Sequence, residues 1–292
     1  MEEYRRELEV HCYRMLGSVH EAEDLVQETY LKAWRARDGF DGRSSVRTWL
    51  YRIATNACLD ALKARPRRAL PVDLGPGEPE HWLEPIPDAV LDAAGPEAAA
   101  VAREGVELAF LAALQHLPPR QRAVLILRDV LDWSAAETAT LLEMTVPAVN
   151  SALQRAKARV PAAGPAVGPA TAAEHEVARR YADAFQRADI PAMVSLLAQD
   201  ARAAMPPWRS WYQGKDAIEA SLREGRPGLG AIRVRCTGAN RRPAVVAHVR
   251  LEGSSEWQPF AVSVLWIAGG LITDMVAFHD PAVVAVFERA PA

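Results

Sequence analysis

The sequence predicts a multidomain protein in which two all-α modules are followed by one α+β domain. Apolar residues recur at helical spacing through residues 1–65 and again from Arg103 to Val160. Beyond residue 174 the pattern changes to short β-like runs mixed with helices. Segments rich in Pro separate these parts, as linkers do. We therefore expect five segments, with these bounds: 1–68, 69–102, 103–160, 161–173 and 174–292.

Composition places the chain among globular proteins with uneven charge. Its 292 residues suit two or three domains, and 50% of them are apolar. The net charge of -3 conceals an acidic segment, Pro71–Glu104, and a basic one, Val146–Arg159, which carries three cations and no acid. Local charge is therefore a better guide to nucleic-acid binding than the whole-chain balance.

Three cysteines, Cys12, Cys58 and Cys236, are far apart and lack the paired spacing of a zinc or redox site. We expect small buried side chains in a reducing compartment, with no metal and no cofactor. The charged N-terminus fits no signal peptide, and the apolar run Phe260–Ile272 is too short to span a bilayer. The sequence predicts a cytoplasmic protein without a membrane partner.

The first module is predicted to be helical almost throughout. Two helices precede a Gly-containing break at Arg37–Ser45, and a third covers Val46–Leu62 before Pro66 ends it. The apolar residues of the first two helices follow helical spacing: Leu8, Cys12, Met15 and Leu16, then Leu25, Tyr30, Leu31 and Trp34.

The last domain is predicted to be a curved antiparallel sheet packed on helices. The expected helices are Glu174–Ala188, Ile190–Leu197 and Gly214–Glu224. The expected strands are Ile232–Thr237, Ala244–Leu251, Phe260–Ala268 and Leu271–Phe278. Gly269-Gly270 between the last two strands is typical of a two-residue hairpin turn.

The most informative segment, Trp133–Arg159, predicts a helix–turn–helix. Ala135–Leu142 forms the first helix, and Val146–Arg159 forms the second, with Thr145 as its N-cap. Five apolar side chains would face the first helix: Val146, Val149, Leu153, Ala156 and Val160. The opposite face is small, polar and basic: Pro147, Ala148, Ser151, Gln154, Arg155 and Ala158, with Asn150 at its edge.

That outer face can enter a DNA major groove about 12 Å wide, where Asn150 and Gln154 can pair with adenine and Arg155 with guanine or phosphate. The same pattern also fits an ordinary helical hairpin with a solvated face. Glu143 stands at the turn position that usually holds glycine in a left-handed conformation, a strain of about 1 kcal/mol.

The surrounding residues carry a family resemblance. Leu117–Leu125, Arg128–Val130 and Trp133–Arg159 together resemble region four of the extracytoplasmic-function (ECF) sigma factors of bacterial RNA polymerase. Ala22–Trp34 is similar to the polymerase-clamp-binding helix of their region two, and Val46–Asn56 to the promoter-melting and minus-ten helix.

This resemblance implies that the partners are promoter DNA and core RNA polymerase, through its beta-prime clamp and beta flap. The implied polymerase contacts are Asp24, Gln27 and Glu28. The implied minus-ten contacts are Phe40, Arg43, Arg47, Arg52 and Asn56, with Phe40–Ser44 as the loop that captures a flipped base. The implied minus-thirty-five contacts are Asn150, Ser151, Gln154 and Arg155. Many relatives carry Arg or Lys in place of Asn150, which weakens the phosphate contribution here.

The acidic linker is either a phosphate mimic inside the polymerase or a solubilising spacer. Within it, His81–Pro85 is similar to a Trp-Leu-Pro-containing motif of sigma factors that carry an extra C-terminal domain. We expect Trp82 to dock on that domain or on region two.

Residues 174–288 resemble that extra domain, a SnoaL-like (nuclear-transport-factor-2-like) cone fold, through Tyr181–Phe185, Met205–Trp208 and Phe278–Pro281. Cone folds enclose an apolar pocket, so a small apolar molecule is a candidate ligand. Its candidate lining residues are Trp208, His248, Asp274 and His279.

Three functional classes compete. The first is an alternative sigma factor that initiates transcription, has no catalytic residues and is modulated by its fused domain. The second is a one-component DNA-binding regulator that senses a small ligand, which leaves residues 23–34 and 46–56 unexplained. The third is a cone-fold enzyme with accessory helices, which requires an acid–base pair in the pocket.

Overall fold

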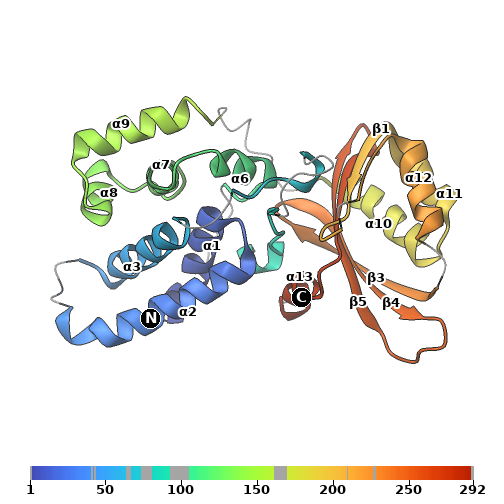
Figure 1. Cartoon of the computed structure of the whole chain (residues 1–292), viewed down its shortest axis with the longest axis horizontal. Coiled ribbons are helices and arrows are strands. Elements are labelled where there is room, and N and C mark those ends of the chain that lie inside the picture. Colours follow the sequence, from blue (N-terminus) through green and yellow to red (C-terminus); the bar gives the residue numbers. More distant parts are fainter. Residues whose placement is uncertain are drawn as a thin grey trace. The chain divides into compact units, whose positions relative to one another are not determined.

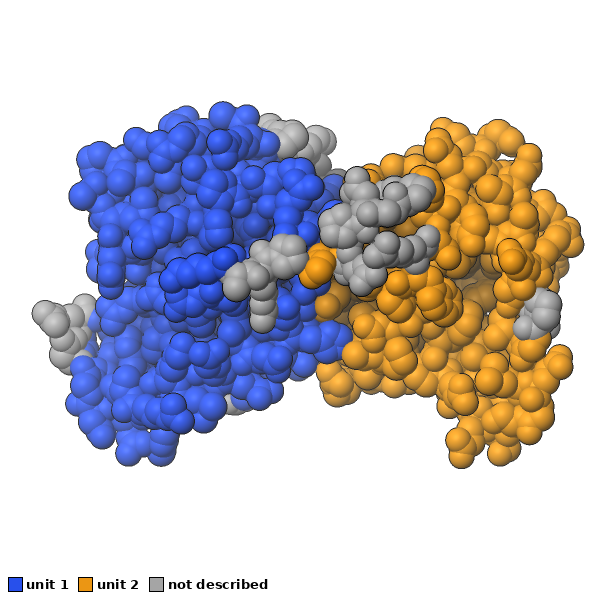
Figure 2. Space-filling model, in the orientation of Figure 1, with its two compact units in different colours: residues 1–69, 90–166 blue, residues 70–89, 167–292 orange. Residues whose placement is uncertain are grey.

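The computed structural model describes residues 2–40, 42, 44–63, 67–73, 81–92, 105–160, 170–208, 210–225 and 228–290. The chain forms two compact units, coloured separately in Figure 2. The first unit joins residues 1–69 with 90–166, and the second joins residues 70–89 with 167–292. The segment between the two all-α modules is therefore shared between the units, with residues 70–89 belonging to the C-terminal one.

The N-terminal part of the first unit is the predicted set of three helices. They are α1 (Arg5–Leu16), α2 (Val19–Ala36) and α3 (Val46–Ala61), with short 3-10 turns at Glu2–Tyr4 and Arg37–Gly39. Gly17 ends α1 in a left-handed conformation (φ +74°), and the Ser18 hydroxyl accepts a hydrogen bond from the Glu21 amide to begin α2. Cys12 and Cys58 are buried as expected, but Cys236 is exposed, because its side chain points outward from a strand of the C-terminal domain.

The second helical module consists of α6 (Leu108–Gln115), α7 (Pro119–Leu125), a π-helical turn (Ile126–Val130), α8 (Ala135–Leu142) and α9 (Val146–Lys157). The predicted helix–turn–helix is confirmed by α8 and α9. Glu143 adopts the left-handed conformation (φ +53°), and the Thr145 hydroxyl accepts from the Ala148 amide at 3.3 Å. Val146 is 41% exposed, so its predicted core position is wrong; Ala152, 3% exposed, packs inward instead because the helix turns it toward α7 and α8.

The two helical modules are packed against one another in the first unit rather than held apart. Arg122 of α7 is only 3% exposed, and its guanidinium donates to the carbonyl oxygen of Met15 at the end of α1. It also donates to the side-chain and main-chain oxygens of Gln115, at 3.0 and 3.2 Å. The ring of Tyr51 in α3 lies 5.3 Å from that of Trp133, which precedes α8. Burial lowers the pKa of Arg122 to about 10, so the buried group remains charged at neutral pH.

The second unit is a six-stranded sheet with helices on both faces (Figure 1). Its strand order is β2-β1-β6-β5-β4-β3. The strands are β1 (Leu197–Ala204), β2 (Trp211–Gln213), β3 (Leu229–Ala239), β4 (Arg242–Leu251), β5 (Gln258–Ala268) and β6 (Leu271–Phe278). One face carries α10 (Ala172–Gln186), α11 (Ile190–Ser195) and α12 (Lys215–Glu224), and the other carries α13 (Pro281–Arg289).

The sheet is mixed, which corrects the prediction of an antiparallel one. β1 runs parallel to β6, while the other neighbouring pairs are antiparallel. The sequence of β1, Leu-Ala-Gln-Asp-Ala-Arg-Ala-Ala, lacks the β-branched and aromatic residues that mark strands, so pairing with β6 rather than local preference makes it a strand. The predicted Gly269-Gly270 turn is confirmed, with both glycines at positive φ.

Replacing the buried guanidinium tests what holds the first unit together. We expect Arg122→Met to lower the free energy of unfolding by at least about 2 kcal/mol, since it leaves buried oxygen atoms without donors. Arg120→Met, on the exposed side of the same helix, is the matched control and should change it by less than about 0.5 kcal/mol. Urea denaturation measures both variants, and equal midpoints would show that the buried contacts contribute nothing.

Candidate polymerase and promoter interface, and the C-terminal cavity

The outer face of α9 exposes all four predicted minus-thirty-five contacts. Asn150, Ser151, Gln154 and Arg155 are exposed, while Val149 and Ala156 on the opposite side are fully buried. At the C-terminal end of α9, the Lys157 ammonium forms a 2.9 Å ion pair with Asp129. The helix therefore presents two amides, a hydroxyl and a guanidinium, which are the groups that pair with base edges and phosphates in a major groove.

The predicted minus-ten residues fall into two groups. Arg52 and Asn56 are exposed one turn apart on α3. The ring of Phe40 instead packs against Trp49, with centroids 4.9 Å apart, at the start of the loop that precedes α3. Arg43 lies outside the described residues.

Arg47 is engaged inside the first unit. Its guanidinium pairs with the Glu7 carboxylate of α1, which also accepts from the Tyr51 hydroxyl at 2.8 Å. The guanidinium carbon lies 5.0 Å from the Tyr51 ring centre and 5.8 Å from that of Trp133. Burial alone would lower the pKa of Arg47, but its hydrogen bonds and charge interactions with Glu7 and Tyr51 together outweigh burial and raise that pKa. In this conformation Arg47 serves internal packing, so binding a phosphate requires it to leave Glu7.

The exposed face of α2 carries the predicted polymerase contacts and two large apolar residues for which no role was predicted. Asp24, Gln27 and Glu28 are exposed. Leu31 and Trp34 follow them at spacings of three and four and are 58% and 59% exposed. A helix face that joins carboxylates to large apolar side chains is typical of a protein interface. The sequence could have indicated the exposure of Leu31, because the helical period places it on the same face as Asp24 and Gln27. Buried Val26 and Ala33 lie on another face of the helix.

A reciprocal pair of hydrogen bonds attaches linker residues 81–89 to the C-terminal domain. The Ile86 amide donates to the Asn240 side-chain oxygen at 2.9 Å, and the Asn240 amide donates to the Ile86 carbonyl at 3.1 Å. The Arg241 amide donates to the Asp88 carboxylate at 2.9 Å. Leu83 is fully buried, and Trp82 is half-buried in the same unit.

A second linker contact lies at the 3-10 turn Pro71–Asp73. Arg202 of β1 donates to Asp73 at 3.1 Å and to Asp274 of β6 at 2.6 Å. The two carboxylates thus share one guanidinium, so Asp274 is occupied by a structural ion pair.

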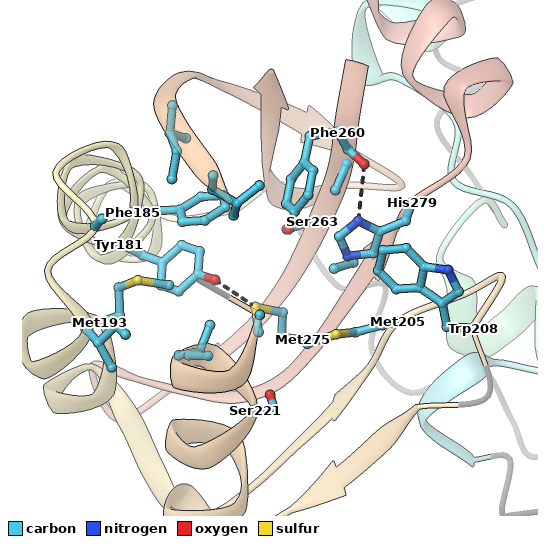
Figure 3. A pocket seen from close by; sticks show the side chains of 18 residues that line it. Tyr181, Phe185, Met193, Met205, Trp208, Ser221, Phe260, Ser263, Met275 and His279 are labelled. Atoms are coloured by element: carbon cyan, nitrogen blue, oxygen red, sulfur yellow. Dashed lines mark hydrogen bonds between the residues drawn. The ribbon is translucent and has the colours of Figure 1, made fainter. Parts of the chain in front are cut away.

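The C-terminal domain contains a cavity of about 190 Å³ between its helices and the sheet (Figure 3). Trp208 and His279 line it, together with Tyr181, Phe185 and Met275. His248 and Asp274 do not, which corrects their prediction as lining residues. Successive strand residues face opposite sides of a sheet, so Met275 and Ala277 reach the cavity while Asp274 faces away. His248 instead pairs with Glu288 of α13 at 2.6 Å.

In the described ranges, no group of three or more His, Cys, Asp or Glu side chains converges as metal ligands would. No helix among those same residues has the length and apolarity needed to cross a bilayer.

Comparison with known proteins defines the class. Residues 1–68 match the family model of sigma-70 region 2, residues 107–160 that of sigma-70 region 4, and residues 178–275 that of the SnoaL-like domain. The chain is 45% identical over 297 aligned positions to the ECF RNA polymerase sigma factor SigG of Mycobacterium tuberculosis, covering 96% of this chain and 80% of that protein. It is 35% identical to the ECF sigma factor SigW of Bacillus subtilis over 147 positions, covering 50% of this chain and 76% of SigW.

One solved structure matches nearly the whole chain. The crystal structure of the M. tuberculosis ECF sigma factor SigJ superposes with a TM-score of 0.62 at 24% identity, covering 98% of this chain and 97% of that one. The molecule is thus of the sigma-70 class, with two sigma regions and a SnoaL-like domain. The chain belongs to the ECF RNA polymerase sigma factors. It is an alternative sigma factor, and therefore a transcription factor rather than an enzyme. This family membership rules out the second functional class, a one-component DNA-binding regulator.

Changing Asn240 tests the attachment of the linker. Asn240 has φ +50°, a conformation that Asn and Gly tolerate better than Ala. We expect Asn240→Ala and Asn240→Gly to speed hydrogen exchange at Ile86 by about tenfold or more, since both remove its acceptor. Asn240→Asp keeps an oxygen acceptor and should preserve protection. Unchanged exchange in the Gly variant would show that the side chain does not fasten the linker.

Proposed function

We propose that this sigma factor binds core RNA polymerase through the exposed face of α2 and reads promoter DNA through α3 and α9. Polymerase contacts are assigned to Asp24, Gln27 and Glu28, extended by Leu31 and Trp34, on the beta-prime clamp, while the region-four module meets the beta flap. The minus-ten element is assigned to Phe40, Arg43, Arg47, Arg52 and Asn56. The minus-thirty-five element is assigned to Asn150, Ser151, Gln154 and Arg155.

The observation that carries this proposal is the division of α9 into a buried and a polar face. Its inner side is held by α7 and α8, so the orientation of the outer side is fixed by the fold. Four adjacent polar side chains on a rigid helix supply base contacts, and a helix of small residues such as Ala148 and Ala158 can approach DNA closely.

The packing of the first unit implies that the two modules separate before they engage a promoter. Elements at minus thirty-five and minus ten lie about 25 base pairs apart, or about 85 Å at roughly 3.4 Å per base pair. A compact unit of about 150 residues is only about 40 Å across. Opening would break the contact of Arg122 with Met15, that of Trp133 with Tyr51 and that of the Arg47 guanidinium with the Trp133 ring.

The C-terminal domain is assigned a regulatory, non-catalytic role. Catalysis in a cone pocket requires a carboxylate or a comparable acid–base pair, and the described lining residues of the cavity include no Asp or Glu. The domain instead holds the linker between the two sigma regions, at Ile86 and at Asp73. A domain that binds this linker can limit how far the two sigma regions separate.

Alanine substitution on α9 tests promoter recognition. With core polymerase and a matching promoter, we expect Gln154→Ala and Arg155→Ala each to lower run-off transcription by about 5- to 100-fold, the loss of one base contact of about 1–3 kcal/mol. If Arg155 binds phosphate, its removal should also reduce the slope of log K against log salt concentration by about one.

The matched control is Arg187→Ala, an exposed arginine at the end of α10 that pairs with Asp183. It should leave run-off transcription unchanged. Transcription at the unmodified level in both α9 variants would contradict the assignment of this face to DNA.

The α2 face is tested by polymerase binding. We expect Trp34→Ala to weaken binding to core polymerase by about 30-fold, as truncation of a central interface aromatic of about 2 kcal/mol does. Trp257→Ala removes another exposed tryptophan, in the C-terminal domain, and serves as the control. Titration of labelled protein with core polymerase measures both, and equal affinities would place the interface elsewhere.

A further inference from the structure

The cavity of the C-terminal domain is walled by α10, α11 and α12 on one side and by the sheet on the other (Figure 3). Its volume of about 190 Å³ exceeds that of a cavity of about 150 Å³ that accommodates benzene. An apolar space of this size left inside a domain forfeits packing contacts, so an occupant would recover them.

The lining accepts an apolar and uncharged occupant. Most of its side chains are aromatic or aliphatic, and three are methionines, Met193, Met205 and Met275, whose flexible thioethers adapt to different shapes. The described lining residues include no Asp, Glu, Lys or Arg. A charged ligand would therefore lose its hydration without gaining an ionic partner, which disfavours its entry.

His279 supplies an oriented hydrogen-bond acceptor. Its Nδ1–H donates to the Phe260 carbonyl at 3.1 Å, which leaves Nε2 with a lone pair. Burial lowers the pKa of His279 to about 4, so the ring is neutral at pH 7. Trp208 stacks on the imidazole with centroids 4.3 Å apart, and Phe260 contacts it edge-on at 4.7 Å. These rings fix the imidazole, which extends toward the cavity in Figure 3.

Two other polar groups of the lining already have partners. The Tyr181 hydroxyl donates to the Met275 sulfur at 3.1 Å, and the Ser221 hydroxyl donates to the Ile218 carbonyl of its own helix at 3.2 Å. The Ser263 hydroxyl also lies in the lining, but Nε2 of His279 is held in a fixed direction by the contacts of its ring, so it is the acceptor best placed to select an occupant.

We propose that this cavity binds a small, uncharged, largely apolar molecule, about the size of one substituted aromatic ring, which donates an O–H or N–H hydrogen bond to Nε2 of His279. Trp208, which is 55% exposed, forms the rim through which the molecule enters. This ligand site goes beyond the role in transcription, and binding to the free sigma factor can be measured without polymerase.

Titration calorimetry on the full chain at pH 7 tests the proposal with four probes of similar size. They are p-cresol, a neutral ring with a hydroxyl donor; toluene, which lacks the donor; benzoate, an anion; and benzylammonium, a cation. We expect p-cresol and toluene to bind and the two ions to bind at least tenfold more weakly than p-cresol.

The decisive variant is His279→Phe, which keeps an aromatic ring but removes the acceptor. We expect it to weaken p-cresol binding by about tenfold and toluene binding by less than about twofold, because only the phenol loses a hydrogen bond. His248→Phe, on the opposite face of the same sheet, is the matched control and should leave both affinities unchanged.

Three results would overturn the proposal: no binding of either neutral probe up to its solubility, binding of benzoate as tight as that of p-cresol, or equal loss of p-cresol and toluene in His279→Phe. The comparison of neutral and charged probes needs only the unmodified protein, so it holds even if the variant folds poorly. Failure of these tests would leave the assignments of α2, α3 and α9 untouched.

Discussion

The architecture of the sigma regions depends on one buried cation. Arg122 joins α7 to the end of α1 by hydrogen bonds to carbonyl and amide oxygens, without a carboxylate. Neutral acceptors stabilise a buried guanidinium less than a carboxylate would, and its desolvation opposes the gain. The hydrogen bonds of Arg122 thus hold the two modules together, while the desolvation of its guanidinium reduces the net stabilisation. That balance fits the proposal that the two modules part when polymerase and promoter offer more favourable partners.

Arg47, one of the proposed minus-ten contacts, contributes to this packing. In the compact unit it neutralises Glu7 and lies near Tyr51 and Trp133. On an opened promoter the same guanidinium would face phosphates. Under the proposed role, one side chain would have two competing partners, the Glu7 carboxylate of the same module and a phosphate on DNA.

The sequence predicted those features that are set locally. The helices and their caps at Ser18 and Thr145, the left-handed Glu143 and the Gly269-Gly270 turn all follow from side-chain chemistry within a few residues. What it missed depends on partners distant in the chain. The polar, alanine-rich β1 is a strand because β6 pairs with it, and Ala152 of α9 is buried by its contacts with other helices while Val146 is exposed. His279 lines the cavity, whereas His248 pairs with Glu288 of α13, a difference that their sequence context did not indicate.

The cavity and the linker attachment meet on the same two strands. Arg202 of β1, which also pairs with Asp274 of β6, holds Asp73 on one face of the sheet. On the other face, neighbouring Met275 lines the cavity, and Met205 does so directly after β1 ends. Side chains one residue apart in a strand share a backbone, so a ligand at the proposed site that shifted β1 or β6 would also move the groups that bind the linker. Such coupling would be reciprocal in free energy: a ligand that tightened the attachment of the linker would itself bind more tightly, by the same factor, when the linker is attached.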